Sequence, residues 1–521
     1  MAQDTTAQYG HVAQQRLFTA LAAGAALDPG PGGVDRIETH ISCVFLAGEH
    51  AYKVKKAVDL GFVDFTTLDS RHHACQEELR LNARLAPEVY LRVAAITGDP
   101  DAPVLDGDGP VLDYAVVMQR FPQTALLNRM LEAGSLTAAH IAELGGRIAR
   151  FHEAIPAAPA DAVYGSPDAV RRRVNENLEA LPELMPDRPD QLESLRQWSE
   201  SHMKALEETI ERRRLEGRVR ECHGDLHLEN IIYWRGRVMA FDGIEFDPDL
   251  RWIDVASEIA FLTMDLDDRG AGRFACQLRN DYLEATGDYD ALRVLGFYQV
   301  YRALVRAKIN ALQAGQRTDG ASQLLGAARA YLDLAQAYTK PHAPALVLMH
   351  GVSGTGKSTL TQALINGRGF IRLRSDVVRK RLFGLQEHES SHAAGLDIYT
   401  AEASRRTYER MADLARDVLD SGYGVVLDAT FLRREHRAPF LRLAESAGVP
   451  WHIVSLQGDP AVLRERVHRR QAAGGDASEA DAAVLEHQLA ESESLSDGER
   501  AHATTLDITD IPEDWHRHLP G

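Results

Sequence analysis

A phosphate-binding loop is the clearest chemical feature of the chain. Residues 351–358 read GVSGTGKS and fit the spacing G-x-x-x-x-G-K-[ST], directly after an apolar stretch, ALVLMH, that has the character of a buried strand. The glycines let backbone N–H groups approach a phosphate, and the helix that follows favours negative charge at its N-terminus. Lys357 can reach the terminal phosphates, and Ser358 can ligand Mg²⁺. The predicted nucleotide contacts are Gly351, Ser353, Gly354, Thr355, Gly356, Lys357, Ser358 and Thr359.

Charged residues downstream of this loop could complete a site for phosphate transfer. Asp376 follows a second strand, where a carboxylate could take the proton of an acceptor hydroxyl, and Arg379 lies one helical turn later. Asp428 ends a third strand, where a ligand for Mg²⁺ and its water is expected. Arg466 and Arg470 share one face of a later helix that precedes a glycine-rich segment. The alternative for each is a solvated surface charge, and for Asp376 a helix cap.

A second group of residues has the spacing of a catalytic loop for phosphoryl transfer. Residues 223–230 read HGDLHLEN, which has the form H-x-D-x-x-x-x-N, and Asp242 follows on the second strand of a predicted hairpin. In such loops Asp225 would orient or deprotonate the acceptor hydroxyl. Asn230 and Asp242 would hold Mg²⁺ on the phosphates. The turn at 235–236 should bring these two residues together, which joint metal binding requires.

The elements that must position these residues follow two different patterns. From residue 345 onward, short apolar strands alternate with amphipathic helices, which predicts a doubly wound parallel sheet. Before that point, strand patterns at 41–63 and 113–122 give way to long helical stretches at about 126–215 and from 257 to 338. On the predicted helix 70–85, Glu78 shares a face with Ala74, Leu81 and Leu85. Two prolines at 341 and 344 mark a linker between the patterns.

Composition limits the classes of protein that the chain could represent. Its 521 residues carry a formal net charge of -18, which disfavours general binding to nucleic acid, although local basic patches remain compatible with it. No apolar run approaches the roughly 20 residues that a membrane helix needs. The polar N-terminus and the four scattered cysteines lead us to expect a cytoplasmic protein.

The C-terminal part resembles the small P-loop kinases that include polynucleotide 5′-hydroxyl kinase, gluconate kinase and the zeta-toxin group. The resemblance covers roughly residues 345–475 and rests on GVSGTGKST, SDVVR and LDAT. These motifs do not name the acceptor.

The segment 220–256 resembles aminoglycoside phosphotransferases and the related choline- and fructosamine-kinase-like enzymes, which share the protein-kinase fold. This resemblance implies an ATP-contacting lysine on the third strand of a small N-lobe, for which Lys53 fits better than Lys55, and an acidic partner at Glu78. It also implies a hinge at MQRF (118–121) and a structural role for Asp254. The turn LAGEH lacks the pattern G-x-G-x-x-G, and the usual D-F-[ED] is replaced by DGIE, which leaves Glu245 open as a further ligand.

Together these features predict two domains of mixed α/β and α+β class. We expect an aminoglycoside phosphotransferase-like domain at 1–340, with an N-lobe at about 30–120 and a helical C-lobe at about 121–340, and a P-loop kinase domain at 341–521. The predicted function is an ATP-dependent kinase with two nucleotide sites that uses ATP and Mg²⁺ and transfers the γ-phosphate to a hydroxyl of a small molecule.

Two alternatives remain open from the sequence. A nucleic-acid end kinase is favoured by the basic runs 378–381 and 464–470 and opposed by the net charge. A non-catalytic nucleotide sensor is opposed by the presence of both candidate bases, Asp225 and Asp376.

Overall fold

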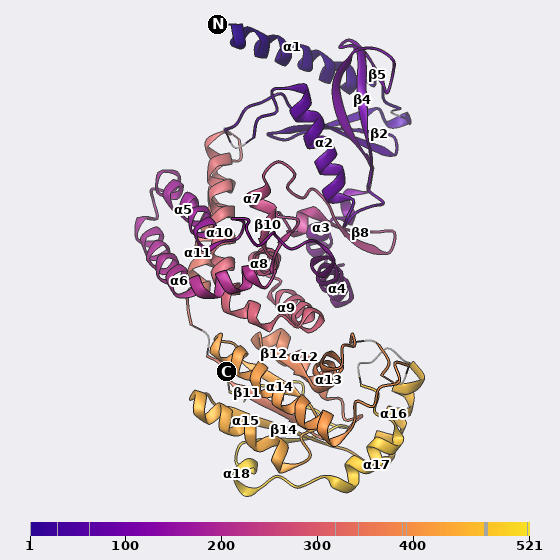
Figure 1. The fold of residues 1–521 in the computed structure, drawn as a ribbon, viewed down its shortest axis with the longest axis vertical. Helices are drawn as coiled ribbons and strands as arrows, with labels where there is room; N and C mark the ends of the chain where they lie inside the picture. The colour runs from indigo at the N-terminus through magenta and orange to yellow at the C-terminus, as the bar shows by residue number, and fades with distance from the viewer. Residues whose placement is uncertain are drawn as a thin grey trace. The chain divides into compact units, whose positions relative to one another are not determined.

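A computed structural model describes residues 2–520 except 29, 62, 318, 342, 388, 392, 474–477 and 518 (Figure 1). For residues 2–11, 472 and 473 it describes the backbone but not the side chains. The chain forms two compact units. The first comprises residues 1–140, 151–172 and 210–265, and the second comprises 141–150, 173–209 and 266–521. Helices that precede the predicted linker therefore belong to the same compact unit as the phosphate-binding loop. Within the described residues, no helix is long and apolar enough to cross a membrane.

A six-stranded antiparallel sheet dominates the N-terminal part of the first unit. Its strand order is β1-β2-β3-β6-β4-β5, formed by β1 (Val34–Glu38), β2 (Ser42–Ala47), β3 (His50–Lys55), β6 (Val111–Gln119), β4 (Tyr90–Asp99) and β5 (Ala102–Leu105). Helix α1 (Ala2–Ala22) adds Leu17, Phe18 and Leu21 to the core on this sheet. The predicted strand pair at 41–63 is confirmed as β2 and β3.

Helix α2 packs against β6, β4 and β3 and confirms the predicted helix at 70–85. It spans Leu68–Asn82, and the Thr67 side chain caps it by accepting from the Ser70 N–H. The predicted buried face is observed, because Ala74 and Leu81 are buried and Glu78 is fully buried beside them. A fully buried carboxylate needs a charged partner, so this helix face already points to an ion pair.

The region of the predicted catalytic loop is built from two small antiparallel pairs. Strand β7 (Val219–Glu221) pairs with β10 (Trp252–Asp254), and β8 (Ile231–Trp234) forms a hairpin with β9 (Arg237–Ala240). Arg235 and Gly236 at the turn have φ values of 51° and 74°, as a two-residue hairpin with positive φ at both positions requires. Asn230 directly precedes β8, whereas Asp242, predicted to lie on the second strand, lies two positions beyond the end of β9.

Eight helices of the described residues confirm the predicted helical regions. They are α3 (Leu127–Glu132), α4 (Ala138–Ala154), α5 (Pro167–Leu184), α6 (Pro189–Leu215), α8 (Val255–Asp268), α9 (Gly272–Thr286), α10 (Leu292–Gly315) and α11 (Ala321–Tyr338). The short helix α7 (Pro248–Arg251) lies between those regions and was not predicted.

The second unit holds the predicted parallel sheet, in the order β12-β13-β11-β14-β15. Its strands are β12 (Ile371–Arg374), β13 (Val425–Asp428), β11 (Leu346–His350), β14 (Trp451–Gln457) and β15 (Ala503–Asp507), and all neighbours are parallel. The chain winds to one side of β11 and then to the other. The C-terminal end of β11 is therefore the switch point at which ligands gather in such sheets.

Helices connect these strands as the alternating pattern predicts. They are α12 (Lys357–Arg368), α13 (Ser375–Leu382), α14 (Ala401–Asp420), α15 (Arg434–Ala447) and α16 (Pro460–Ala473), drawn in orange to yellow in Figure 1. The short helices α17 (Ala482–Glu491) and α18 (Asp497–Arg500) and the edge strand β15 were not predicted, because none of them has a long periodic pattern.

Candidate active sites

The phosphate-binding loop forms a cradle around the N-terminus of α12. The helix begins at Lys357, and Gly356 before it takes a left-handed conformation with φ 89°. The Lys357 Nζ donates to the carbonyl oxygens of Gly351 at 2.9 Å and Val352 at 3.0 Å. Burial lowers the pKa of Lys357 to about 8, although the Asp428 and Asp376 carboxylates partly oppose this shift. The lysine is thus a half-buried cation whose hydrogen-bond acceptors among the described residues are neutral carbonyls.

A cavity of about 1140 Å³ opens in front of this loop. Of the predicted nucleotide contacts, all but Gly351 and Thr355 line it; Thr355 is buried and its hydroxyl donates to the Val352 carbonyl at 2.8 Å. The cavity is also lined by the five charged residues predicted from sequence: Asp376, Arg379, Asp428, Arg466 and Arg470. The volume is slightly above the usual range for one small ligand, so it is large enough for a nucleotide with an acceptor beside it.

Helix α13 presents the candidate base at one end of the cavity. It begins at Ser375, with Arg374 as its N-cap residue, so Asp376 lies within the first turn rather than at the cap. Arg379 Nη1 donates to Asp376 Oδ1 at 3.3 Å, and its guanidinium lies 4.8 Å from the centre of the Tyr399 ring. The Arg379 Nε is buried without a hydrogen-bond partner among the described residues. This end therefore combines a carboxylate with a cation that has a donor to spare.

Asp428 has the surroundings of a cation ligand. It ends β13, is 6% exposed, and its Oδ2 is buried with no hydrogen-bond partner among the described residues. Ser358 lines the same cavity. A carboxylate oxygen and a hydroxyl are oxygen ligands of the kind that Mg²⁺ prefers, so this pair fits the predicted metal position.

Other cavity residues could not be found from spacing. Gln488 on α17 accepts a hydrogen bond from the Ser353 backbone N–H through its Oε1 at 2.7 Å. Tyr408 on α14 stacks on His436 of α15, with ring centres 4.3 Å apart. These residues come from helices remote in sequence from the loop, and no motif marks them.

In the first unit, the predicted lysine, its acidic partner and the predicted metal ligand form one ion-pair network. Lys53 Nζ lies 2.8 Å from Glu78 Oε1 and also contacts the Asp242 carboxylate. Burial alone would lower the pKa of Lys53, but Asp242 and Glu78 outweigh it and raise that pKa well above its usual range. The two lysines lower the pKa of the buried Glu78 carboxyl.

Lys55 and Glu245 extend this network inward. Lys55 is fully buried and pairs with both Glu78 and Glu245. Glu245, left open as a metal ligand, is itself 7% exposed and engaged by Lys55. Lys53 is the lysine that contacts the predicted metal ligand Asp242, while Lys55 anchors the end of the same loop.

The loop from 242 to 245 is held in a strained conformation. Asp242 has φ 61°, an uncommon value for a residue with a side chain. The Tyr90 hydroxyl accepts from the Asp242 N–H at 3.0 Å, and Asn82 Oδ1 accepts from the Gly243 N–H at 2.7 Å. Both partners belong to the N-terminal sheet and α2, so the lobe that holds Lys53 also fixes Asp242.

The catalytic-loop residues cluster as their spacing predicts. Asn230 Nδ2 donates to Asp225 Oδ2 and to the Asp225 carbonyl, both at 3.0 Å. His227 Nε2 lies 3.4 Å from the same Asp225 oxygen. The Phe241 N–H donates to the Asn230 carbonyl at 2.9 Å, which places the backbone of Asn230 beside the residue that precedes Asp242.

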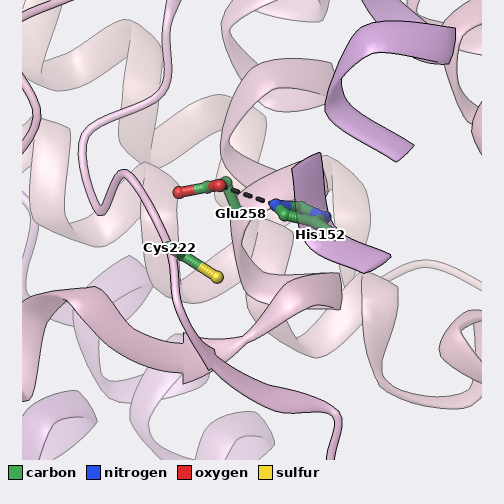
Figure 2. Close-up of side chains that lie close together, drawn as sticks. All are labelled: His152, Cys222 and Glu258. Atoms are coloured by element: carbon green, nitrogen blue, oxygen red, sulfur yellow. Dashed lines mark hydrogen bonds and ion pairs between the residues drawn. The ribbon is translucent and has the colours of Figure 1, made fainter. Parts of the chain in front are cut away.

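A buried brace lies under this loop, formed by His152, Cys222 and Glu258 (Figure 2). Their nitrogen, sulfur and oxygen atoms lie within 4.8 Å of one another, but Glu258 already uses both oxygens. One accepts from His152 Nε2 and the other from the Gly224 N–H, each at 2.7 Å. We therefore interpret the group as a support for the loop rather than as a metal site. Asp254, predicted to be structural, is buried and pairs with Arg213 at 2.8 Å.

Two family models match the chain, one in each of the two regions that contain a candidate site. The model of the phosphotransferase enzyme family matches residues 62–295, and the model of an AAA domain matches residues 346–495. The chain is thus similar to the phosphotransferase enzyme family in its N-terminal part and to the AAA domain in its C-terminal part. Uncharacterised proteins of Mycobacterium tuberculosis and Mycobacterium bovis are each 29% identical over 456 residues, which is 87% of this chain and 89% of theirs.

Solved structures of two kinases match part of the chain. A gluconokinase from Sinorhizobium meliloti is 22% identical and covers 33% of this chain and 86% of its own, with a TM-score of 0.25. A choline/ethanolamine kinase family protein from Mesorhizobium loti is 13% identical and covers 62% of this chain and 99% of its own, with a TM-score of 0.35.

Proposed function

We propose that the protein is an ATP-dependent kinase with two nucleotide sites, and that the P-loop site transfers the γ-phosphate to a hydroxyl group of a small molecule. The observation that supports this most is the single cavity that brings Lys357, Asp376, Arg379 and Asp428 together. A protein that only bound nucleotide would need the loop and the lysine, but not a carboxylate paired with an arginine in the same cavity.

The roles follow from the geometry. The loop N–H groups and Lys357 bind the phosphates, and Arg466 and Arg470 neutralise charge that develops during transfer. Asp376 accepts the proton of the acceptor hydroxyl as its oxygen bonds to the γ-phosphorus, while the bond to the bridging oxygen breaks and ADP leaves. Arg379 holds the acceptor. Mg²⁺, held by Ser358 and Asp428, would supply further positive charge at the phosphates.

The N-terminal site supports the same class of reaction with other residues. Asp225 would act on the acceptor hydroxyl, and Asn230 and Asp242 would hold Mg²⁺. Lys53 would contact the nucleotide phosphates after leaving Asp242, with Glu78 retaining its position through Lys55.

The nucleic-acid alternative receives less support from the structure than from the sequence. In the basic run 378–381, Arg379 is 8% exposed and Lys380 is 1% exposed. Arg464 and Arg469 are exposed but pair with Glu486 and Glu465. These residues do not form the open row of cations that a nucleic-acid backbone would need.

A transfer screen with labelled ATP tests the proposal. The full chain, Asp225→Asn and Asp376→Asn are incubated with separate pools of sugars and polyols, amino alcohols, aminoglycosides and oligonucleotides. We expect a small-molecule pool to be labelled, and Asp376→Asn to reduce labelling at the P-loop site by about a hundredfold with little change in ATP affinity.

A matched control and one decisive outcome complete the screen. Asp514→Asn removes an exposed aspartate that pairs with Arg517 and should leave labelling unchanged. Labelling of oligonucleotides alone, with a steep salt dependence, would replace the small-molecule proposal with the end-kinase alternative. Full labelling by Asp376→Asn would contradict its role as the base.

A further inference from the structure

Helix α9 makes specific contacts with the edge of the parallel sheet. It belongs to the sequence matched by the phosphotransferase family, yet it lies in the same compact unit as the P-loop region. Asn280 on α9 donates to the Phe370 carbonyl at 2.9 Å and accepts from the Arg372 N–H at 2.8 Å. One side chain thus satisfies two backbone groups at the start of the edge strand β12, the carbonyl just before it and the second N–H within it, as a neighbouring strand would.

The next turn of α9 reaches the residues that enter the cavity. Glu284 is 5% exposed at its side chain and pairs with Arg372 at 2.8 Å and with Arg374 at 3.3 Å. Arg374 lines the cavity and is the N-cap residue of α13, two positions before Asp376. Glu284 therefore restrains the start of the helix that presents the candidate base.

The other end of α13 is bound to the same place. Arg381 in its last turn donates through Nη2 to the backbone carbonyls of Glu284 at 2.7 Å and Ala285 at 3.0 Å. These carbonyls belong to the last turn of α9, where helix carbonyls lack partners and attract cations.

A glycine makes this approach possible. Gly287, the C-cap residue of α9, has φ 69°. A Cβ built on it would lie 2.8 Å from the Arg381 Cζ. Any other residue at this position would displace the guanidinium as well as adopt an unfavourable φ.

We infer that the C-terminal end of α9 is a positioning platform for the P-loop site, on which Glu284, Gly287 and Arg381 fix α13 so that Asp376 and Arg379 face the phosphates. An isolated helix of eight residues is not stable, so α13 needs external restraint at both ends. The catalytic part of this inference rests on the proposed function, whereas the docking of α13 does not.

The test uses the full chain with Gly287→Ala, Arg381→Ala and the double variant. Gly448→Ala is the matched control for the glycine, since it caps α15 with φ 67° and its added Cβ meets nothing within 4 Å. Arg214→Ala is the control for the arginine, because it also donates to two backbone carbonyls, those of Ala160 and Ala162, in the other compact unit. The probe is Mg²⁺-ATP, with water as the acceptor.

Two readouts separate docking from catalysis. Amide hydrogen exchange over residues 375–382 should become at least about tenfold faster in both single variants and in neither control. ATP turnover at the P-loop site should fall by about tenfold or more, while ATP affinity changes by less than about twofold. In these two readouts the double variant should resemble Arg381→Ala alone, because the added methyl has no guanidinium to displace. The unfavourable φ that it keeps is the one that the Gly448→Ala control also introduces.

Two results of the exchange measurement would overturn the inference. Exchange over 375–382 no faster than in Gly448→Ala would show that α13 does not depend on α9. An equal rise over all strands of the sheet, with loss of ATP affinity, would indicate general destabilisation instead. If the wild-type protein does not hydrolyse ATP with water as the acceptor, the exchange measurement alone decides whether α9 positions α13. The proposed function is then decided by the transfer screen with its acceptor pools.

Discussion

The two candidate phosphate-binding lysines lie in opposite electrostatic surroundings. Lys53 contacts two carboxylates, Glu78 and Asp242, which raise its pKa despite burial. Among the described residues, Lys357 donates to the neutral carbonyls of Gly351 and Val352 and to no carboxylate, and burial lowers its pKa to about 8. Lys53 therefore already contacts its anions, whereas Lys357 contacts no anion in the part of the chain that the structure describes.

Nucleotide binding should therefore change the contacts of the two lysines in different ways. At the N-terminal site a nucleotide must compete with Asp242 for Lys53, and part of the attraction between lysine and phosphate replaces an existing ion pair. At the P-loop site the phosphates would bring negative charge to the half-buried Lys357. The P-loop lysine should therefore matter mainly for binding, and Lys53 for both binding and stability.

The largest expected effect is on ATP affinity at the P-loop site. Lys357→Met, made in a chain whose N-terminal site is disabled by Asp242→Asn, should weaken Mg²⁺-ATP binding by about a hundredfold, because charge-assisted hydrogen bonds to the phosphates are lost. Isothermal calorimetry measures this directly. Lys340→Met, at an exposed lysine, is the control. If the Lys357 variant binds ATP with unchanged affinity, the phosphate-binding loop is not the nucleotide site.

The comparison becomes sharper when stability is measured. Lys53→Met should destabilise the first unit by about 2 kcal/mol, because it leaves Asp242 and part of Glu78 without a cation, although Lys55 still pairs with Glu78. Lys357→Met should cause no loss of stability, since it removes a half-buried cation that contacts no carboxylate among the described residues. Urea-dependent hydrogen exchange, read from β3 and from α12, measures each effect in its own region. Equal losses of stability in the two variants would show that the two lysines do not differ in this way.

A pH dependence should distinguish the two sites. Below a pH of about 8 Lys357 is charged in the free protein; above it the lysine is neutral and must take up a proton when phosphates bind. ATP affinity at this site should then fall by up to about tenfold per pH unit. The raised pKa of Lys53 keeps it charged over the same range, so affinity at its site should stay flat. Calorimetry at high pH in buffers of different ionisation enthalpy measures the proton uptake, and equal uptake at both sites would contradict the prediction.

The smallest expected effect concerns the side chain that covers the loop. Gln488→Ala removes the acceptor of the Ser353 N–H and leaves that donor free for a phosphate oxygen. Replacing the hydrogen bond to Gln488 with one to a phosphate oxygen should stabilise the complex with ATP by about 1 kcal/mol. ATP affinity should therefore rise by roughly fivefold. Gln362→Ala, which removes an amide bonded to Asn366 on α12, should have no such effect. A fall in affinity would instead make Gln488 part of the nucleotide site.

The sequence was most informative where chemistry depends on local spacing. The phosphate-binding loop, the turn at Arg235–Gly236 and the shared helix face of Glu78 each involve residues within a few positions, and backbone geometry fixes how such neighbours lie. Asp376, Arg379 and Asp428 could be placed at one edge because parallel strands end together.

Contacts between distant segments could not be predicted in this way. Gln488 lies 135 positions from Ser353, and Glu284 lies 88 positions from Arg372. Nothing in the local pattern of α9 distinguishes a helix that packs within its own region from one that binds another sheet. The basic run 378–381 was misleading for a related reason, because charge counts do not show that Lys380 is buried against the Glu387 carbonyl.

The hydrogen bonds of Asn280 have a consequence for solubility. Strand β12 is at one edge of the parallel sheet, and in the full chain Asn280 satisfies the Phe370 carbonyl and the Arg372 N–H. A fragment cut at the proline-containing linker would lack α9 and expose this strand. Unpaired edge strands associate with copies of themselves, so the fragment 341–521 should self-associate as its concentration rises, whereas a fragment that begins before Gly272 should not.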